Sequence, residues 1–285
     1  MRTVSFPGFT RREFLGAMSA ASIGTSLGLV TDGLAAAATR RIPIGLQLYS
    51  LRDECAKDLP GMLTAVSRFG YKGVEFAGYH GRNAKELRKM LDDNGLRACG
   101  THTPFETVLP DQLKATIEFN HTIGNTFLIV PSMEDIEKKQ EWITRARLFN
   151  DIAGKIKGDG MFVGYHSHEL DFKTAEGATR WDLFCSNTNP EVILQLDTSN
   201  CRDAGADPVA VLKKYPGRTR TIHIKANGAG PEAVIGEDKI DWKEVFAFCE
   251  GPGKTDWYVV EHETSKNPLD AVKRNYAALR KLGKV

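Results

Sequence analysis

The sequence predicts a single-domain (β/α)8 barrel, or TIM barrel, that begins after an N-terminal segment of different character. From residue 40 onward, short apolar runs alternate with amphipathic stretches of helical period. Eight such pairs follow one another, which is the repeat number of this α/β fold. A doubly wound open sheet is the main alternative, but it usually has a glycine-rich phosphate turn after its first strand, and Gln47-Leu48-Tyr49-Ser50 stands there instead.

The expected strands are apolar runs bounded by turn residues, and we number them one to eight in chain order. They are Ile42–Leu48, Gly73–Phe76, Arg97–Thr101, Thr126–Val130, Met161–His166, Val192–Asp197, Thr219–Ile224 and Trp257–Glu261. The amphipathic stretches between them predict helices. Examples are Leu59–Phe69, Ala84–Asn94, Gln112–Ile123, Glu141–Lys157, Pro208–Tyr215, Trp242–Cys249 and Pro268–Leu282. Glycine turn signals such as Phe69-Gly70-Tyr71 and Asn94-Gly95 mark the ends of the first two helices.

The N-terminal segment, residues 1–38, has the features of an export signal. Arg11 and Arg12 precede a weakly hydrophobic stretch, 14–30, and the small residues of 34–38 suit a signal-peptidase site. A twin-arginine pair in this position indicates the twin-arginine pathway, with the translocase as a partner during export and a periplasmic destination. A buried helix or a membrane anchor is the alternative, although the stretch is short for a membrane span. Residues 39–285 then form the barrel, with no stable membrane span after cleavage.

Composition narrows the class of protein further. The 38 Lys and Arg residues nearly balance the 36 Asp and Glu residues, so the formal charge of +2 argues against a nucleic-acid binder. A hydrophobic content of 41% is ordinary for a soluble globular domain. The five cysteines form no CxxC pair and predict no disulfide framework, and their redox state stays open. The oligomeric state stays open too, a homo-oligomer included.

Polar residues gather where the expected strands end, which is the catalytic face of a (β/α)8 barrel. A buried carboxylate costs several kcal/mol unless it is paired or coordinates a metal ion. Asp197, His223 and Glu261 end three consecutive strands, so together they predict a site for one divalent cation. Oxygen and imidazole donors without thiolate suit Mn²⁺, Mg²⁺, Co²⁺ or Zn²⁺, and the sequence does not choose among them.

Each residue at this face also has a structural interpretation. A single histidine at a strand end is more often structural than a ligand. Asp197 could merely cap the turn that follows it. Glu75 could pair with a neighbouring lysine. The set as a whole, rather than any one member, therefore supports the metal site.

From residue 42 to the end, the chain resembles the xylose isomerase-like barrel superfamily, the sugar phosphate isomerase/epimerase group. The matching segments are 44–50, Tyr165-His166-Ser167-His168 with Asp171-Phe172, Leu196-Asp197-Thr198, Ile222-His223-Ile224-Lys225, 235–237 with 240–242, and Val260-Glu261. The resemblance implies metal ligands at Asp197, His223 and Glu261, with the strand-five ligand falling on His166 or on His168. The epimerase branch has a catalytic glutamate at that strand-five position, and this chain has a histidine.

The resemblance further implies a carbohydrate or polyol substrate bound through the metal. A group at the strand ends would remove a proton next to a carbonyl, giving an enediolate. We expect the catalytic residues to be drawn from His166, His168, Glu261 and Lys225. Weaker candidates for substrate contact are Gln47, Glu75, His102 and Asp171.

Three functions are compatible with this chemistry. The first expectation is a metal-dependent sugar isomerase or epimerase. The second is a lyase, hydrolase or dehydratase that acts on keto-sugars or 3-keto-glycosides by the same proton abstraction, and export favours it because phosphorylated sugars are scarce outside the cytoplasm. The third is a non-catalytic periplasmic barrel that binds a sugar.

Overall fold

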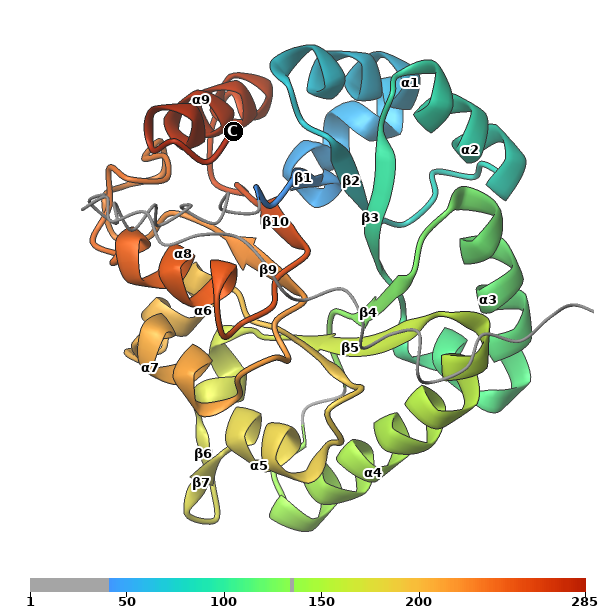
Figure 1. Ribbon diagram of the computed structural model, residues 1–285, viewed down its shortest axis with the longest axis vertical. Coiled ribbons are helices and arrows are strands. Elements are labelled where there is room, and N and C mark those ends of the chain that lie inside the picture. The colour runs from blue at the N-terminus through green and yellow to red at the C-terminus, as the bar shows by residue number, and fades with distance from the viewer. Residues whose placement is uncertain (1–40, 134–135) are drawn as a thin grey trace, which may run out of the picture. The chain divides into compact units, whose positions relative to one another are not determined.

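The computed structural model describes residues 41–133 and 136–285, so the predicted export signal lies outside the described residues. Within this part, eight short parallel strands form the barrel wall (Figure 1). They are β1 Ile44–Gln47, β2 Gly73–Ala77, β3 Arg97–His102, β4 Phe127–Val130, β5 Phe162–His166, β8 Ile193–Gln195, β9 Thr221–Ile224 and β10 Trp257–Val260. Each coincides with one of the eight predicted strands, which confirms the predicted fold.

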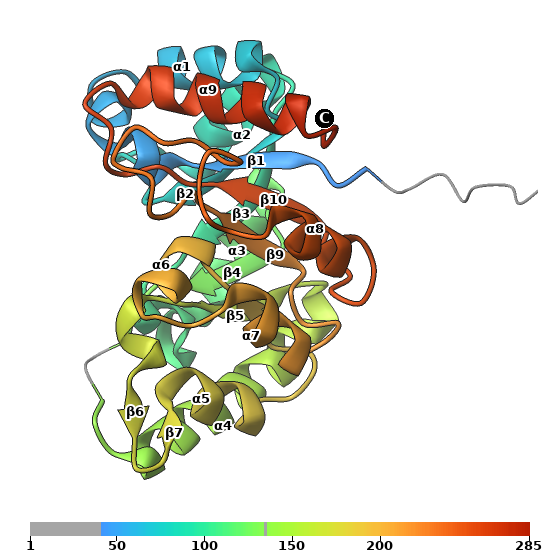
Figure 2. The ribbon, with the colours of Figure 1, turned by 90° about the vertical axis from the view of Figure 1, so that its left-hand side faces the viewer.

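Helices surround the strands, as the view in Figure 1 and the perpendicular view in Figure 2 show. They are α1 Arg52–Phe69, α2 Ala84–Asp93, α3 Pro110–Ile123, α4 Lys139–Ile156, α5 Arg180–Asn187, α6 Thr198–Asp203, α7 Pro208–Lys214, α8 Trp242–Glu250 and α9 Pro268–Lys281. Short 3-10 turns precede or follow several of them: η2 Leu48–Leu51, η3 Phe105–Val108, η4 Lys157–Asp159 and η5 Glu169–Phe172. A small hairpin, β6 Thr174–Ala175 and β7 Ala178–Thr179, lies between η5 and α5.

The strands are ordered β8-β5-β4-β3-β2-β1-β10-β9, so β8 and β9 face each other across the closing seam. The seam is joined by a parallel bridge between Asp197 and His223. The backbone N–H of His223 donates to the carbonyl of Leu196 at 2.9 Å. Barrel closure therefore brings together two of the predicted metal ligands.

The strand period of two separates the barrel interior into layers. Toward the N-terminal ends, Cys99, Ile129, Ile193 and Val259 belong to a small buried apolar cluster that also includes Phe127 and Trp257. Two residues further along their strands, the same face carries Gln195 after Ile193 and Glu261 after Val259. The interior thus changes from apolar to polar toward the C-terminal ends, where the site lies.

Two differences from the predicted elements have local causes. Helix α1 consists of two parts that meet at a kink at Asp58 (φ −150°, ψ 74°). The second part starts at the predicted Leu59, and the first part, from Arg52, was not predicted. The Asp58 carboxylate accepts from the Gly61 N–H at 2.9 Å, which caps the second part of the helix. Helix α5 and the β6–β7 hairpin were not predicted, because elements of eight and two residues leave little periodicity to detect.

All five cysteines lie in the described part of the chain, where each is a buried free thiol. Among the described residues, no helix is both long enough and apolar enough to cross a membrane.

Candidate metal centre

Four predicted ligands converge at the C-terminal ends of consecutive strands. His166 ends β5, Asp197 follows β8, His223 lies on β9 and Glu261 follows β10. One ligand atom from each lies within 4.8 Å of the others, and all four side chains are buried. The His223 Nδ1 atom lies 3.2 Å from Glu261 Oε2 and 3.8 Å from Asp197 Oδ2. We call these four residues the metal cluster.

The two oxygens of Asp197 have different surroundings. Oδ1 accepts from the Asn200 N–H at 2.8 Å and caps α6, as the structural interpretation of this residue expected. Oδ2 is buried and has no hydrogen-bond partner among the described residues. A buried carboxylate oxygen without a partner is costly, and a cation among these donors would satisfy it. Two imidazoles and two carboxylates are a donor set that suits Mn²⁺, Co²⁺ or Zn²⁺, so the residues fit a divalent cation.

The charges in the cluster are strongly coupled. Burial raises the pKa of Asp197 to about 6, against the attraction of Lys225 and with the repulsion of Glu261. Burial alone would lower the pKa of His223, but Glu75 and Glu261 raise it to about 10. Burial disfavours the Glu261 anion as well, yet His223 and Lys225 hold the pKa of its carboxyl well below the usual range. Positive charge in this pocket is therefore favoured, and a divalent cation could supply it in place of a proton.

The strand-five histidines, His166 and His168, have separate positions. His166 is part of the metal cluster, and burial lowers the pKa of its ring well below the usual value. His168 is exposed to a cavity, and its ring centroid lies 4.8 Å from that of His166. Partial desolvation, with the nearby charges of His102 and Lys225, lowers the pKa of His168 to about 4 despite Glu261. At neutral pH His168 is thus an uncharged imidazole beside the cluster.

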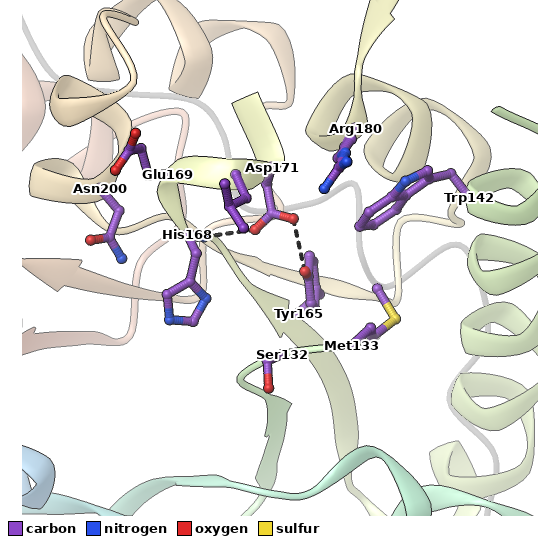
Figure 3. Close-up of a pocket in the computed structure, with 10 residues that line it drawn as sticks. Ser132, Met133, Trp142, Tyr165, His168, Glu169, Asp171, Arg180 and Asn200 are labelled. Carbon is purple, nitrogen blue, oxygen red and sulfur yellow. Dashed lines mark hydrogen bonds between the residues drawn. The ribbon is translucent and has the colours of Figure 1, made fainter. Parts of the chain in front are cut away.

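The cavity at His168 has a volume of about 420 Å³ (Figure 3). Its lining combines aromatic, polar and charged side chains from β4 to α6: Ser132, Met133, Trp142, Tyr165, His168, Glu169, Leu170, Asp171, Arg180 and Asn200. Asp171 accepts from the Tyr165 hydroxyl at 2.9 Å and from the His168 backbone N–H at 2.7 Å, as the dashed lines in Figure 3 show. Asp171 therefore fixes the loop that carries His168.

A second cavity of about 470 Å³ lies beside α3, with Tyr79, Thr103 and Phe119 in its wall. His102 lines this cavity, and its ring stacks on that of His223 at 5.2 Å between centroids. The predicted contact residue His102 thus lies between a cavity and a predicted ligand.

Glu75 is fully buried beneath the metal cluster, where its carboxylate meets nitrogen atoms of four side chains. The distances are 2.8 Å to Gln47 Nε2, 2.9 Å to Gln195 Nε2, 2.5 Å to His223 Nε2 and 3.2 Å to His102 Nε2. Its ionic partners are histidines rather than the neighbouring lysine considered from the sequence. Burial would raise its pKa, but His102 and His223 hold it well below the usual range.

Lys225 reaches the cluster from the exposed side. Its Nζ lies 2.9 Å from Glu263 Oε1 and 3.7 Å from Glu261 Oε2. Burial would lower its pKa, but Asp197, Glu261 and Glu263 raise it, so Lys225 is a cation at neutral pH. It can bind an oxygen atom that gains negative charge.

Sequence reasoning missed two residues of the site. Gln195 donates from Nε2 to Glu75, and its Oε1 lies within hydrogen-bond distance of His166 Nδ1 and His102 Nε2. A signal was available in the sequence, because Gln195 precedes Asp197 by two residues and shares its face of the strand. Arg180 lines the cavity from the start of α5, a helix that was not predicted.

Known proteins share the fold and part of the sequence of this chain. An inosose dehydratase of Geobacillus thermodenitrificans is 27% identical over 272 aligned positions, which cover 78% of this chain and 90% of the relative. A solved structure described as a sugar phosphate isomerase/epimerase from Parabacteroides distasonis has a TM-score of 0.75 and 27% identity, covering 86% of this chain and 99% of that one. An L-ribulose 3-epimerase, at 17% identity and a TM-score of 0.65, shares the fold. The family described as xylose isomerase-like TIM barrel matches residues 63–282, and the chain belongs to this family.

Proposed function

We propose that the chain is a divalent-metal-dependent enzyme that removes a proton next to the ketone of a keto-sugar or keto-polyol. The observation that carries the proposal is the buried metal cluster, in which Asp197 Oδ2 has no hydrogen-bond partner among the described residues, beside a cavity that is lined by an uncharged imidazole. The cation would be held by His166, Asp197, His223 and Glu261. When bound, it would polarise the substrate carbonyl and acidify the neighbouring C–H bond.

His168 is the residue that we assign as the base. It lines the cavity, and its low pKa keeps the ring uncharged at neutral pH. The hydrogen bond from its backbone N–H to the Asp171 carboxylate fixes its loop. His166 and Glu261 are less suited to this role, because both are buried and held by the cluster. Lys225 is placed to bind the substrate oxygen that gains negative charge when the proton leaves.

The fate of the proton separates the reaction classes. A protonated His168 can return the proton to the neighbouring carbon, which is an isomerisation, or to a β-hydroxyl that leaves as water, which is a dehydration. Epimerisation needs a second group on the opposite face of the carbon, and the epimerase-branch glutamate of strand five is replaced here by His166. We therefore place dehydration of a keto-polyol first, which the named dehydratase relatives support.

Isomerisation of a sugar, the first expectation from the sequence, is the second candidate. The likeness to the Parabacteroides distasonis structure described as a sugar phosphate isomerase/epimerase supports it. Cleavage of a 3-keto-glycoside would use the same proton abstraction, with an aglycone leaving in place of water.

The test is a solvent-exchange experiment in D₂O on inosose, free ketoses and 3-keto-glycosides, with and without EDTA. Loss of water with deuterium uptake supports the dehydratase, and exchange with a rearranged sugar supports the isomerase. Release of an aglycone supports the lyase. Binding without exchange would indicate a non-catalytic sugar-binding barrel. Full activity of enzyme that EDTA treatment has freed of metal would refute metal dependence.

We further propose that residues 1–38 are a twin-arginine signal and that residues 39–285 reach the periplasm as a folded barrel. The Arg11-Arg12 pair supports this, and export of a folded chain allows the metal to be loaded beforehand. Fractionation of cells that express the wild type and the Arg11→Lys, Arg12→Lys variant tests it, since the variant should stay in the cytoplasm at full length.

A further inference from the structure

We propose that Glu75 is a positioning residue that sets the ring tautomers of both imidazole ligands, His223 directly and His166 through Gln195. This inference rests on the proposed metal centre. It assigns to Glu75 a role beneath the ligands, where the sequence had indicated substrate contact.

The surroundings of Glu75 identify it as an acceptor only. The side-chain oxygen of Gln47 accepts from the Tyr49 N–H at 3.0 Å, so the amide nitrogen of Gln47 is the atom that faces Glu75, at 2.8 Å. Gln195 Nε2 donates to the other Glu75 oxygen at 2.9 Å. Because two amide groups direct N–H bonds at the carboxyl group, an ionised carboxylate satisfies both.

The first tautomer follows from the contact with His223. Its Nε2 lies 2.5 Å from Glu75 Oε2, and a carboxylate cannot donate, so the proton resides on Nε2. The other ring nitrogen, Nδ1, faces Glu261 Oε2 and Asp197 Oδ2. Nδ1 is therefore the nitrogen of His223 that is available to a cation.

The second tautomer follows through Gln195. Its amide nitrogen is oriented by Glu75 Oε1 and by the Thr221 hydroxyl at 3.2 Å. The amide oxygen must then face the opposite way, and it lies 2.9 Å from His166 Nδ1. His166 donates from Nδ1, which leaves Nε2 as its free nitrogen. One buried carboxylate thus gives the two ligands opposite tautomers.

Burial separates this role from substrate binding. Glu75 has no exposed surface, and a Cβ atom added to Gly100 would lie 2.3 Å from its Oε1, so the protein closes tightly around the carboxylate. Carboxylate partners of metal-bound histidines commonly improve metal affinity by 10- to 100-fold.

The experiment measures the affinity of Co²⁺ and Zn²⁺ for the purified enzyme by competition with a chromophoric chelator. We expect Glu75→Gln to weaken both metals by about 10- to 100-fold, because the new amide offers a donor to His223 Nε2 and favours a proton on Nδ1. Gln195→Met removes the connection to His166, together with the contacts to His102 and Glu75 Oε1, but leaves the direct contact between Glu75 and His223, so it should weaken binding less. Asp197→Asn reports on the centre itself and should abolish tight binding.

A second measurement does not depend on how the variants fold. In ¹⁵N-labelled Zn²⁺-loaded wild type, long-range ¹H–¹⁵N spectra should show His223 protonated on Nε2 and His166 protonated on Nδ1. The same tautomer on both rings, or Glu75→Gln with wild-type affinity, would overturn the inference while the metal centre stands. A wild type that binds neither metal would instead refute the proposed function.

Discussion

Replacing Asp197 by Asn should stabilise the metal-free protein and remove its response to metal. Burial raises the pKa of this carboxyl from 3.8 to about 6, so above pH 6 the fold bears the cost of an anion that the unfolded chain keeps in water. A shift of about two units corresponds to at most about 3 kcal/mol. Asn removes the charge and retains an oxygen for the Asn200 N–H that caps α6.

We therefore expect the variant to be more stable by about 1 to 3 kcal/mol at pH 7.5 after EDTA treatment. For a barrel of this size, each kcal/mol raises Tm by roughly 2–4 °C. Saturating metal should reverse the order, because a ligand at 1,000 times its Kd adds about 4 kcal/mol to a protein that binds it. The measurement is differential scanning calorimetry of both proteins in EDTA and in Mn²⁺, Co²⁺ or Zn²⁺.

Asp207→Asn is the matched control. Asp207 caps α7 through the Val209 N–H at 3.2 Å, away from the cluster, so its variant should stay within about 0.5 kcal/mol of the wild type in both buffers. The reasoning would be refuted by an Asp197→Asn protein that is less stable in EDTA yet gains as much from metal as the wild type.

Three further predictions address the base, the cavity wall and the barrel interior. His168→Asn should lower kcat by about 10²- to 10⁴-fold with metal affinity near wild type, and a chelator competition showing lost metal instead would assign His168 to the metal. Burial raises the pKa of Asp171 to about 6, although its hydrogen bonds oppose the shift. The free energy of unfolding should therefore fall by up to about 3 kcal/mol as the pH rises from 4 to 7. Urea titrations should show a clearly smaller slope in Asp171→Asn than in the wild type, since Asp197 contributes a slope of its own over this pH range, and equal slopes would contradict the prediction. Gly164→Ala should destabilise by more than 1 kcal/mol, because the added Cβ would lie 2.6 Å from Ile193 Cβ. Gly154→Ala, on an open face of α4, should stabilise by about 0.5 kcal/mol, and similar denaturation midpoints for the two would be inconsistent with the packing.

The strands and the cluster were accessible from the sequence because both follow from local patterns. An apolar run ending in a charged residue locates a strand and its C-terminal end together, which is how Asp197, His223 and Glu261 were found. Gln195 carries neither a charge nor a motif, so its role depends on which side chains face it across the barrel. Glu75 was recognised as a candidate, but its contacts with the histidines were not predicted, since only the assembled barrel brings His223 and His102 to its carboxylate.

The position of the seam explains why the metal and the fold should depend on each other. β8 and β9 are the terminal strands of the sheet order, and the bridge that joins them pairs Asp197 with His223. Asp197, whose burial raises its pKa, thus lies where the barrel closes. A cation held by both would offset the repulsion between Asp197 and Glu261 and link the seam at its C-terminal end. Metal binding should therefore protect the backbone amides of β8 and β9 from hydrogen exchange more than those of β3 and β4, which do not lie at the seam.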